Sequence, residues 1–134
     1  MNKNSNNIFK FMLAFALSCS FSLKASVESI NNVQDFNNKI TSTQKVTIIK
    51  FGASWCEPCQ KLKPIFEQVA QECPDCNFFE VDIDGTRTIV NSLNISSVPT
   101  IIIRDQQGND VVRLVGIQSK ETILNKIAEV KKTS

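Results

Sequence analysis

A chain of 134 residues with a formal net charge of +2 has room for one compact domain. Three of its 15 basic residues lie in the first 25 positions, which contain no acidic residue, so the remainder carries 12 basic against 13 acidic residues. A nearly neutral body without a basic run lacks the positive footprint of a nucleic-acid-binding protein, so we expect no nucleic-acid partner. The ordinary apolar and charged fractions exclude a disordered or collagen-like chain.

The first 25 residues have the layout of a secretory signal peptide: a basic polar stretch, an apolar run over 11–17, and small or polar residues up to Ala25. The apolar run is well short of the ~20 residues that a membrane-spanning helix needs. We therefore expect cleavage after Ala25, with Ser22 as an alternative end, and a folded domain over 26–134. A further alternative is a bacterial lipoprotein signal that ends before Cys19 and leaves this residue lipid-anchored. Either way we expect an exported protein of the periplasm or cell envelope.

The first half of the domain begins with two strand signals separated by a helix signal. Residues 25–30 can form a short strand, and Asn32 can cap a helix. The apolar face of that helix consists of Val33, Phe36 and Ile40. Residues 46–51 are a nearly continuous β-branched run, typical of a strand buried on both faces of a sheet with parallel neighbours.

The longest predicted helix follows the tight 52–54 connection. Its apolar positions recur three and four residues apart, at Leu62, Ile65, Phe66, Val69 and Cys73. Pro64 lies inside this helix and lacks a backbone donor, so we expect a kink there.

A third strand is predicted over 77–82, followed by a short helix that Thr86 can cap and that runs through Leu93. Asn94 can take the left-handed conformation that ends such a helix. Asn94 also begins an Asn-x-Ser glycosylation sequon, but we favour the helix-ending role unless the source is eukaryotic.

The last elements are a hairpin and a helix. Residues 101–104 and 110–115 flank the polar 105–109 turn, and Ser119 can cap a final helix. The inward positions of that helix are Ile123, Leu124 and Ile127. The order strand, helix, strand, helix, strand, helix, strand, strand, helix predicts an α/β fold with a mixed sheet and helices on both faces.

The Cys56-Glu57-Pro58-Cys59 segment lies where a buried strand gives way to the long helix. Unpaired amide donors and the helix dipole at that end favour a thiolate on Cys56. A thiolate attacks disulfides, and Cys59, one turn further on, can resolve the mixed disulfide that forms. Glu57 adds a negative charge that opposes the thiolate, so we expect reduction of substrates, while Pro58 holds the turn at the helix start.

The residues around this dithiol resemble those of the thioredoxin family. The matching segments are Phe51-Gly52-Ala53-Ser54-Trp55-Cys56-Glu57-Pro58-Cys59, Pro64, Val81-Asp82-Ile83-Asp84, Val98-Pro99-Thr100 and Val115-Gly116. They cover nearly everything after residue 25, in the family's order and spacing.

The resemblance implies a thioredoxin fold and a thiol:disulfide oxidoreductase that needs no cofactor or metal. Cys56 would be the nucleophile, Cys59 the resolving thiol, and Trp55 part of the surface that faces the substrate. Pro99 would be a cis-proline beside the dithiol, and Val98 would offer backbone hydrogen bonds to an extended substrate segment. The implied partners are disulfide-containing proteins and, because of the expected compartment, a membrane electron donor; we expect a monomer.

Two departures from the family concern charge. Glu57 stands where a glycine is usual, and Lys50 occupies the strand position that typically holds a buried aspartate. The neighbouring strand should place Glu80 beside Lys50, where many thioredoxins carry a lysine. Because an unpaired buried charge is costly, we expect a Lys50–Glu80 ion pair under the dithiol. Glu80 could accept the proton of the resolving cysteine, or the pair could be purely structural.

A third departure is the second Cys-x-x-Cys pair, Cys73 and Cys76, at the far end of the long helix, where the dipole disfavours a thiolate. A structural disulfide and two packed thiols are both open. A zinc site shared with Cys56 and Cys59 is excluded, because a helix between the pairs separates them by ~20 Å. The rival function, a thioredoxin-fold binding or chaperone module that makes no use of its thiols, is disfavoured by the presence of both cysteines and of Val98-Pro99.

Overall fold

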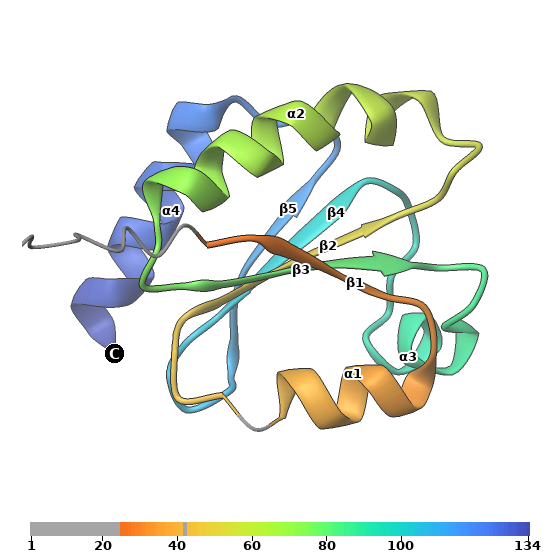
Figure 1. The fold of residues 1–134 in the computed structure, drawn as a ribbon, viewed down its shortest axis with the longest axis horizontal. Coiled ribbons are helices and arrows are strands. Elements are labelled where there is room, and N and C mark those ends of the chain that lie inside the picture. Colours follow the sequence, from red (N-terminus) through yellow and green to blue (C-terminus); the bar gives the residue numbers. More distant parts are fainter. Residues whose placement is uncertain (1–24, 42) are drawn as a thin grey trace, which may run out of the picture.

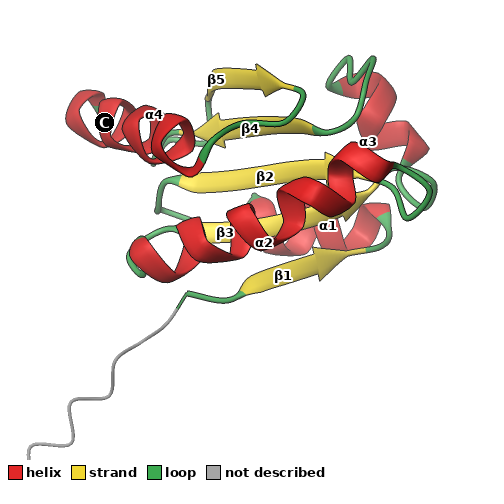
Figure 2. Ribbon diagram, turned by 90° about the horizontal axis from the view of Figure 1, so that it is seen from above, coloured by secondary structure: helices red, strands yellow, loops and turns green. Residues whose placement is uncertain are grey.

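The computed structural model describes residues 25–41 and 43–134 as a five-stranded mixed sheet with helices on both faces (Figures 1 and 2). The elements are β1 (Val27–Ile30), α1 (Val33–Ile40), β2 (Thr47–Gly52), α2 (Glu57–Glu72), β3 (Asn77–Asp82), α3 (Arg87–Ser92), β4 (Thr100–Arg104), β5 (Asp110–Val115) and α4 (Lys120–Thr133). This order is the predicted one. The predicted signal peptide, apart from Ala25, lies outside the described residues, as does Cys19. None of the described helices is long and apolar enough to cross a membrane.

The sheet has the strand order β1-β3-β2-β4-β5. The pairs β1–β3 and β3–β2 are parallel, whereas β2–β4 and β4–β5 are antiparallel. All six residues of β2 are buried, as its β-branched run predicts. The expectation of parallel neighbours is wrong on one side, because burial on both faces follows from the helix layers and does not require two parallel neighbours.

Two helix layers cover the sheet and create two separate cores. Helices α2 and α4 lie on one face, and α1 and α3 lie on the other (Figure 1). Ile48 belongs to the first core and Ile49 to the second, because successive residues of a strand point to opposite faces. The alternation matters for function, since it places Lys50 and Gly52 on the face that α2 covers.

The helix ends are mostly those predicted. Asn32 accepts a hydrogen bond from the Asp35 amide (2.8 Å), and Ser119 accepts one from the Thr122 amide (3.1 Å). Asn94 has the predicted left-handed backbone, with φ of 52°. Thr86 is the N-cap residue of α3, but its side chain does not cap the helix, because the hydroxyl donates instead to the Asp82 carbonyl (2.6 Å).

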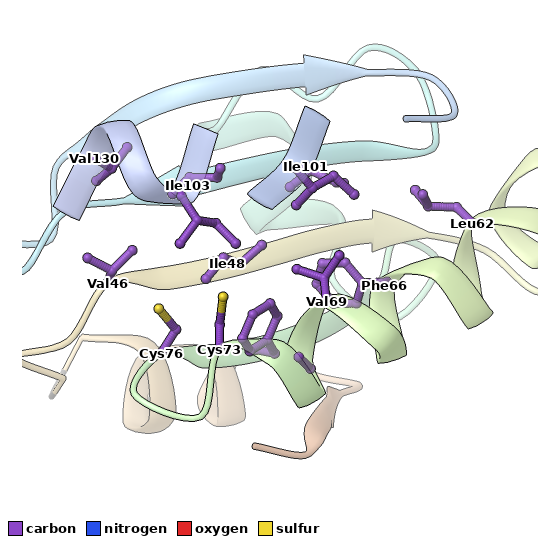
Figure 3. Close-up of a cluster of buried hydrophobic side chains, with 14 residues drawn as sticks. Val46, Ile48, Leu62, Phe66, Val69, Cys73, Cys76, Ile101, Ile103 and Val130 are labelled. Carbon is purple, nitrogen blue, oxygen red and sulfur yellow. The ribbon is translucent and has the colours of Figure 1, made fainter. Parts of the chain in front are cut away.

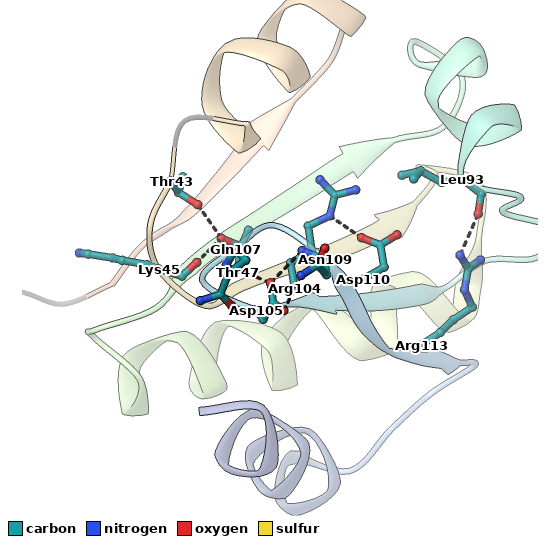
Figure 4. A network of polar contacts seen from close by, with 10 residues as sticks. All are labelled: Thr43, Lys45, Thr47, Leu93, Arg104, Asp105, Gln107, Asn109, Asp110 and Arg113. Atoms are coloured by element: carbon teal, nitrogen blue, oxygen red, sulfur yellow. Dashed lines mark hydrogen bonds and ion pairs between the residues drawn. The ribbon is translucent and has the colours of Figure 1, made fainter. Parts of the chain in front are cut away.

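The predicted β4–β5 hairpin is confirmed, and polar contacts hold its turn (Figure 4). Asp105 accepts hydrogen bonds from the amides of Gln107 (3.0 Å) and Asn109 (2.8 Å). Arg104 pairs with Asp110 across the hairpin (2.5 Å). The turn is therefore held by side chains of the hairpin itself, while Arg113 of β5 donates to the Leu93 carbonyl (2.8 Å) beyond it (Figure 4).

Candidate active site

The first Cys-x-x-Cys pair lies at the amino end of α2 and is closed as a disulfide. The Cα atoms of Cys56 and Cys59 are 5.3 Å apart. Cys56 is the N-cap residue, and the Cys59 amide donates to its sulfur (3.2 Å). An amide aimed at the Cys56 sulfur is the arrangement that stabilises a thiolate once the disulfide is reduced.

The chain around the pair shows why the sequence folds this way locally. The Cys56 amide donates to the Ala53 carbonyl (3.2 Å), which turns the chain from β2 into α2. Pro58 lies in the first turn of the helix, where its missing donor has no helical partner to lose. The Cys59 sulfur lies beside Gly52 at the end of β2, where a Cβ atom would be 3.4 Å from it, at the close end of ordinary van der Waals contact.

The Val98–Pro99 peptide bond is cis, as the resemblance implies. Val98 is half-buried and packs against the small cluster formed by Ala53, Cys56 and Cys59. The Pro99 carbonyl accepts a hydrogen bond from the Gly116 amide (2.8 Å), which ties the proline to the end of β5. Within the described part of the chain, the Val98 amide and carbonyl have no hydrogen-bond partner, so both are free to bind an extended peptide.

Trp55, next to the nucleophile position, is 67% exposed. Its indole nitrogen donates to Asp84 (2.9 Å), which fixes the ring over the surface beside the disulfide. Trp55 and Val98 line a shallow, largely apolar pocket with four further residues, Ile83, Ile95, Ser96 and Ser97. A large exposed aromatic ring beside a redox disulfide supports contact with substrate over simple packing.

Glu57 contributes less negative charge to the site than its position suggests. Its carboxylate is well exposed and forms an ion pair with Lys61 (2.7 Å), one turn further along α2. Solvent and the lysine both screen an exposed carboxylate. The predicted opposition to a Cys56 thiolate is correspondingly weak.

The Lys50–Glu80 ion pair predicted from the strand order is confirmed. The two residues are directly opposite each other in the β2–β3 register, and Lys50 Nζ lies 2.9 Å from Glu80 Oε1. The side chains differ in solvent access: that of Lys50 is 1% exposed and that of Glu80 30%. Glu80 lines a cleft of about 220 Å³ together with Gly52, Ala53 and other residues beside the amino end of α2.

The second pair, Cys73 and Cys76, consists of two free thiols buried in the α2/α4 core (Figure 3). Burial raises the pKa of Cys73, and it raises the pKa of Cys76 to about 11 despite the nearby Lys131 ammonium. The structure thus has the packed-thiol form of the two alternatives. The pairs lie at opposite ends of α2, and no cluster of three or more His, Cys, Asp or Glu residues that could hold a metal occurs in the described ranges.

Three side chains near the site were not singled out as functional in the sequence. Asp84 orients Trp55, and Gln60 and Lys63 line the cleft that contains Glu80. Asp84 belongs to the Val81–Asp84 segment that resembles the thioredoxin family. The resemblance therefore marked this residue but did not predict its hydrogen bond with Trp55. Gln60 and Lys63 carry no such signal, because one helix turn of polar residues is typical of any solvent-facing surface.

A disulfide at a helix amino end, with a cis-proline and an exposed tryptophan beside it in an α/β fold, defines a protein of thiol–disulfide exchange. Comparison with known proteins agrees. The thioredoxin family model matches residues 27–129. The chain therefore belongs to the thioredoxin family and is a thiol-disulfide oxidoreductase.

Individual relatives support the assignment. The chain is 32% identical over 108 residues to the H-type thioredoxin of Fagopyrum esculentum, an alignment that covers 78% of this chain and 91% of the relative. It is 35% identical to the thioredoxin of Chlamydia pneumoniae, with 70% and 89% covered. Among solved structures, thioredoxin from Trypanosoma brucei brucei has a TM-score of 0.73 at 29% identity, with 81% of this chain and 94% of that chain covered.

Proposed function

We propose that the chain is an exported protein-disulfide reductase in which Cys56 is the nucleophile and Cys59 the resolving thiol. The observation that carries this assignment is the Cys59 amide aimed at the Cys56 sulfur at the start of α2. The Cys59 sulfur, in contrast, lies beside Gly52 at the end of β2. The two cysteines therefore have different environments, as a nucleophile and a resolving thiol require.

The reaction is a transfer of two electrons from the reduced dithiol to a substrate disulfide. The Cys56 thiolate attacks one substrate sulfur, which forms a mixed disulfide and releases the other substrate sulfur as a thiolate. Cys59 then loses its proton and attacks the Cys56 sulfur, which releases the second substrate thiol. The protein is left with the Cys56–Cys59 disulfide that the structure contains.

Substrate binding is assigned to the surface around the disulfide. The free amide and carbonyl of Val98 would pair with an extended substrate segment beside Pro99, as in strand addition. The pocket between Trp55 and Val98 would take an apolar side chain of the same segment. Glu80, which lines the cleft beside the amino end of α2, is our candidate for accepting the Cys59 proton during resolution. If a Glu80→Gln protein resolves mixed disulfides at the normal rate, Glu80 is not the acceptor of the Cys59 proton.

Catalysis is tested by reduction of insulin with dithiothreitol as the electron source, followed by turbidity. The domain over 26–134 should accelerate the reaction, and Cys56→Ser should return it to the uncatalysed rate. The matched controls are the Cys73→Ser and Cys76→Ser single variants, which should remain active at a temperature where each is folded. Direction is tested by equilibrating the Cys56–Cys59 pair with glutathione or dithiothreitol buffers. A potential of about −270 mV supports a reductase, and one of about −120 mV supports a disulfide-forming oxidase instead.

Export is the remaining part of the proposal. It rests on the basic and apolar layout of the first 25 residues. Fusion of this segment to alkaline phosphatase, which is active only outside the bacterial cytoplasm, should give an active reporter, and Leu13→Arg within the apolar run should abolish that activity. Cys19→Ser distinguishes the two signals, because it releases only a lipid-anchored protein from the membrane. An exported reductase needs electrons from across the membrane, so we assign it a dithiol donor in the membrane. A monomeric working state remains our expectation.

A further inference from the structure

Lys50 is unusual because it is a charge without access to water. Among the residues that the structure describes, it is the one charged side chain that is buried, with 0% of the residue exposed. A buried ammonium loses its hydration and costs several kcal/mol unless other groups compensate it. How far neighbouring groups neutralise the Lys50 ammonium determines how strong its positive electrostatic field is at nearby residues.

The compensation of Lys50 is incomplete. Glu80 Oε1 lies 2.9 Å from Lys50 Nζ, but the alignment is not that of a hydrogen bond, and the ammonium has no hydrogen-bond partner. Its other neighbour is the ring of Phe66, with the centroid 5.3 Å away. The Glu80 carboxylate is partly solvated from the cleft, so water screens the anion more than it screens the cation. The local field is therefore net positive on the α2 side of the sheet.

That side of the sheet is where the dithiol lies. Lys50 and Gly52 are two residues apart on β2 and share one face, which separates their Cα atoms by ~7 Å. Gly52 is the residue against which the Cys59 sulfur packs. Phe66, which contacts the ammonium, lies on the same buried face of α2 as Cys59. Lys50 thus lies under the middle of α2, two residues along β2 from the glycine beside the sulfur of the resolving cysteine.

The other charges near the dithiol lie at the surface. Glu57 and Lys61 pair with each other on the exposed side of α2. Asp84 is held by the Trp55 indole, and Asp82 and Lys63 line the solvent-filled cleft beside Glu80. Screening by water weakens each of these compared with a charge in the core.

We propose that Lys50 is an electrostatic positioning residue that stabilises the thiolate of the reduced dithiol and so makes the protein a milder reductant than its fold alone would. The inference deepens the proposed function and rests on it. The reduced pair can carry a negative charge at neutral pH and the disulfide cannot, so a buried cation nearby favours the reduced form. Lys50 touches none of the reacting atoms and takes no part in electron or proton transfer.

The test uses Lys50→Met, Glu80→Gln and the double variant in the domain over 26–134. The readouts are the pH dependence of Cys56 alkylation by iodoacetamide and the equilibrium of the pair with glutathione. Lys50→Met leaves the Glu80 anion alone, so alkylation at pH 7 should slow by about fivefold and the equilibrium should move by about threefold toward the disulfide. Glu80→Gln leaves the cation alone and should shift both readouts the opposite way. The double variant should lie between the single variants, on the Lys50→Met side of the wild type, because it removes the net positive field of the pair.

Opposite shifts are the signature, since loss of a merely structural ion pair would disturb both single variants in the same sense. Shifts of the same sign, or none in either readout, overturn the proposal. The double variant should fold, because replacing a buried ion pair by neutral groups is often neutral or stabilising. If Lys50→Met alone does not fold, the double variant against Glu80→Gln removes the same cation in a neutral background.

The inference and the proposed function fail in different ways. Failure of the function would appear as a wild-type domain that does not reduce insulin. Failure of the inference would appear as an active domain whose alkylation profile and glutathione equilibrium are indifferent to the charge at position 50.

Discussion

The two Cys-x-x-Cys pairs share a spacing but lie in opposite environments. Cys56 and Cys59 are at the amino end of α2, where an amide points at the Cys56 sulfur. Cys73 and Cys76 follow the carboxyl end of the same helix, packed in a core of aliphatic side chains and phenylalanines (Figure 3). The helix dipole favours a thiolate at the first end and opposes it at the second, and burial adds to that opposition. Spacing alone therefore does not make a redox centre.

The largest expected difference between the pairs is in catalysis. Cys56→Ser should abolish insulin reduction, and Cys59→Ser should accumulate mixed disulfides between Cys56 and the substrate, since no thiol remains to resolve them. Cys73→Ser and Cys76→Ser, assayed at a temperature where each is folded, should keep at least half of the wild-type rate. A large loss of activity in the folded Cys73 or Cys76 variants would contradict the claim that only Cys56 and Cys59 take part in catalysis.

For stability, in contrast to catalysis, substitution of the second cysteine pair should have the larger effect. Serine at Cys73 or Cys76 places a hydroxyl in an apolar core, which should lower the free energy of unfolding by about 2–3 kcal/mol. Serine at Cys56 stays at a helix N-cap, where its oxygen can accept the Cys59 amide, and should cost less than about 1 kcal/mol. Urea unfolding of the reduced proteins measures both values. Equal losses at both ends of α2 would contradict the account.

Alkaline pH should separate the pairs by a smaller amount. Burial raises the pKa of Cys76 from 9.0 to about 11, so the folded protein holds its proton more tightly than the unfolded chain does. The stability due to the buried thiol is fully present below pH ~9 and is lost as the pH rises toward ~11, by about 1–2 kcal/mol. Unfolding of reduced protein across this range, compared with Cys76→Ala, isolates the effect. The same slope in both proteins would assign it to other groups.

The smallest effect concerns the ion pair beside the second cysteine pair. Lys131 on α4 pairs with Asp75 (2.8 Å), and its hydrogen bond lowers the pKa of Asp75. Because the pair is largely exposed, Lys131→Met should cost only about 0.5 kcal/mol at pH 7. The lowered pKa means that this contribution is present at neutral pH and disappears as acid protonates Asp75. A difference that persisted at pH 2 would mean that Lys131 acts through packing instead.

Elements with strong periodicity could be predicted from the sequence. The β-branched run of β2 and the three- and four-residue spacing in α2 gave the right elements in the right order. Local polar signals were less reliable: Asn32 and Ser119 cap their helices, but the Thr86 hydroxyl bonds a carbonyl instead. A threonine hydroxyl can donate as well as accept, and only the tertiary position decides between the two.

Some features of the candidate site could likewise be predicted from the sequence, and others could not. Cys56 and Cys59 could be predicted from motif spacing and strand order. Pro99 and the Lys50–Glu80 pair could be predicted because the family resemblance assigns positions beside the dithiol. The Trp55–Asp84 and Lys131–Asp75 contacts join residues 29 and 56 positions apart, and no local pattern encodes such contacts. The incomplete compensation of Lys50 also depends on side-chain alignment, which only the folded structure provides.

The most direct test of the comparison is a glutathione titration of the native domain read separately for each cysteine pair. Samples equilibrated over a range of ratios of reduced to oxidised glutathione are quenched with acid, alkylated, and analysed by peptide mass spectrometry. We predict that Cys56 and Cys59 pass reversibly between dithiol and disulfide, while Cys73 and Cys76 remain thiols until the protein is unfolded. A Cys73–Cys76 disulfide that forms and breaks in the same buffers without unfolding would contradict the assignment of one reactive and one packed pair.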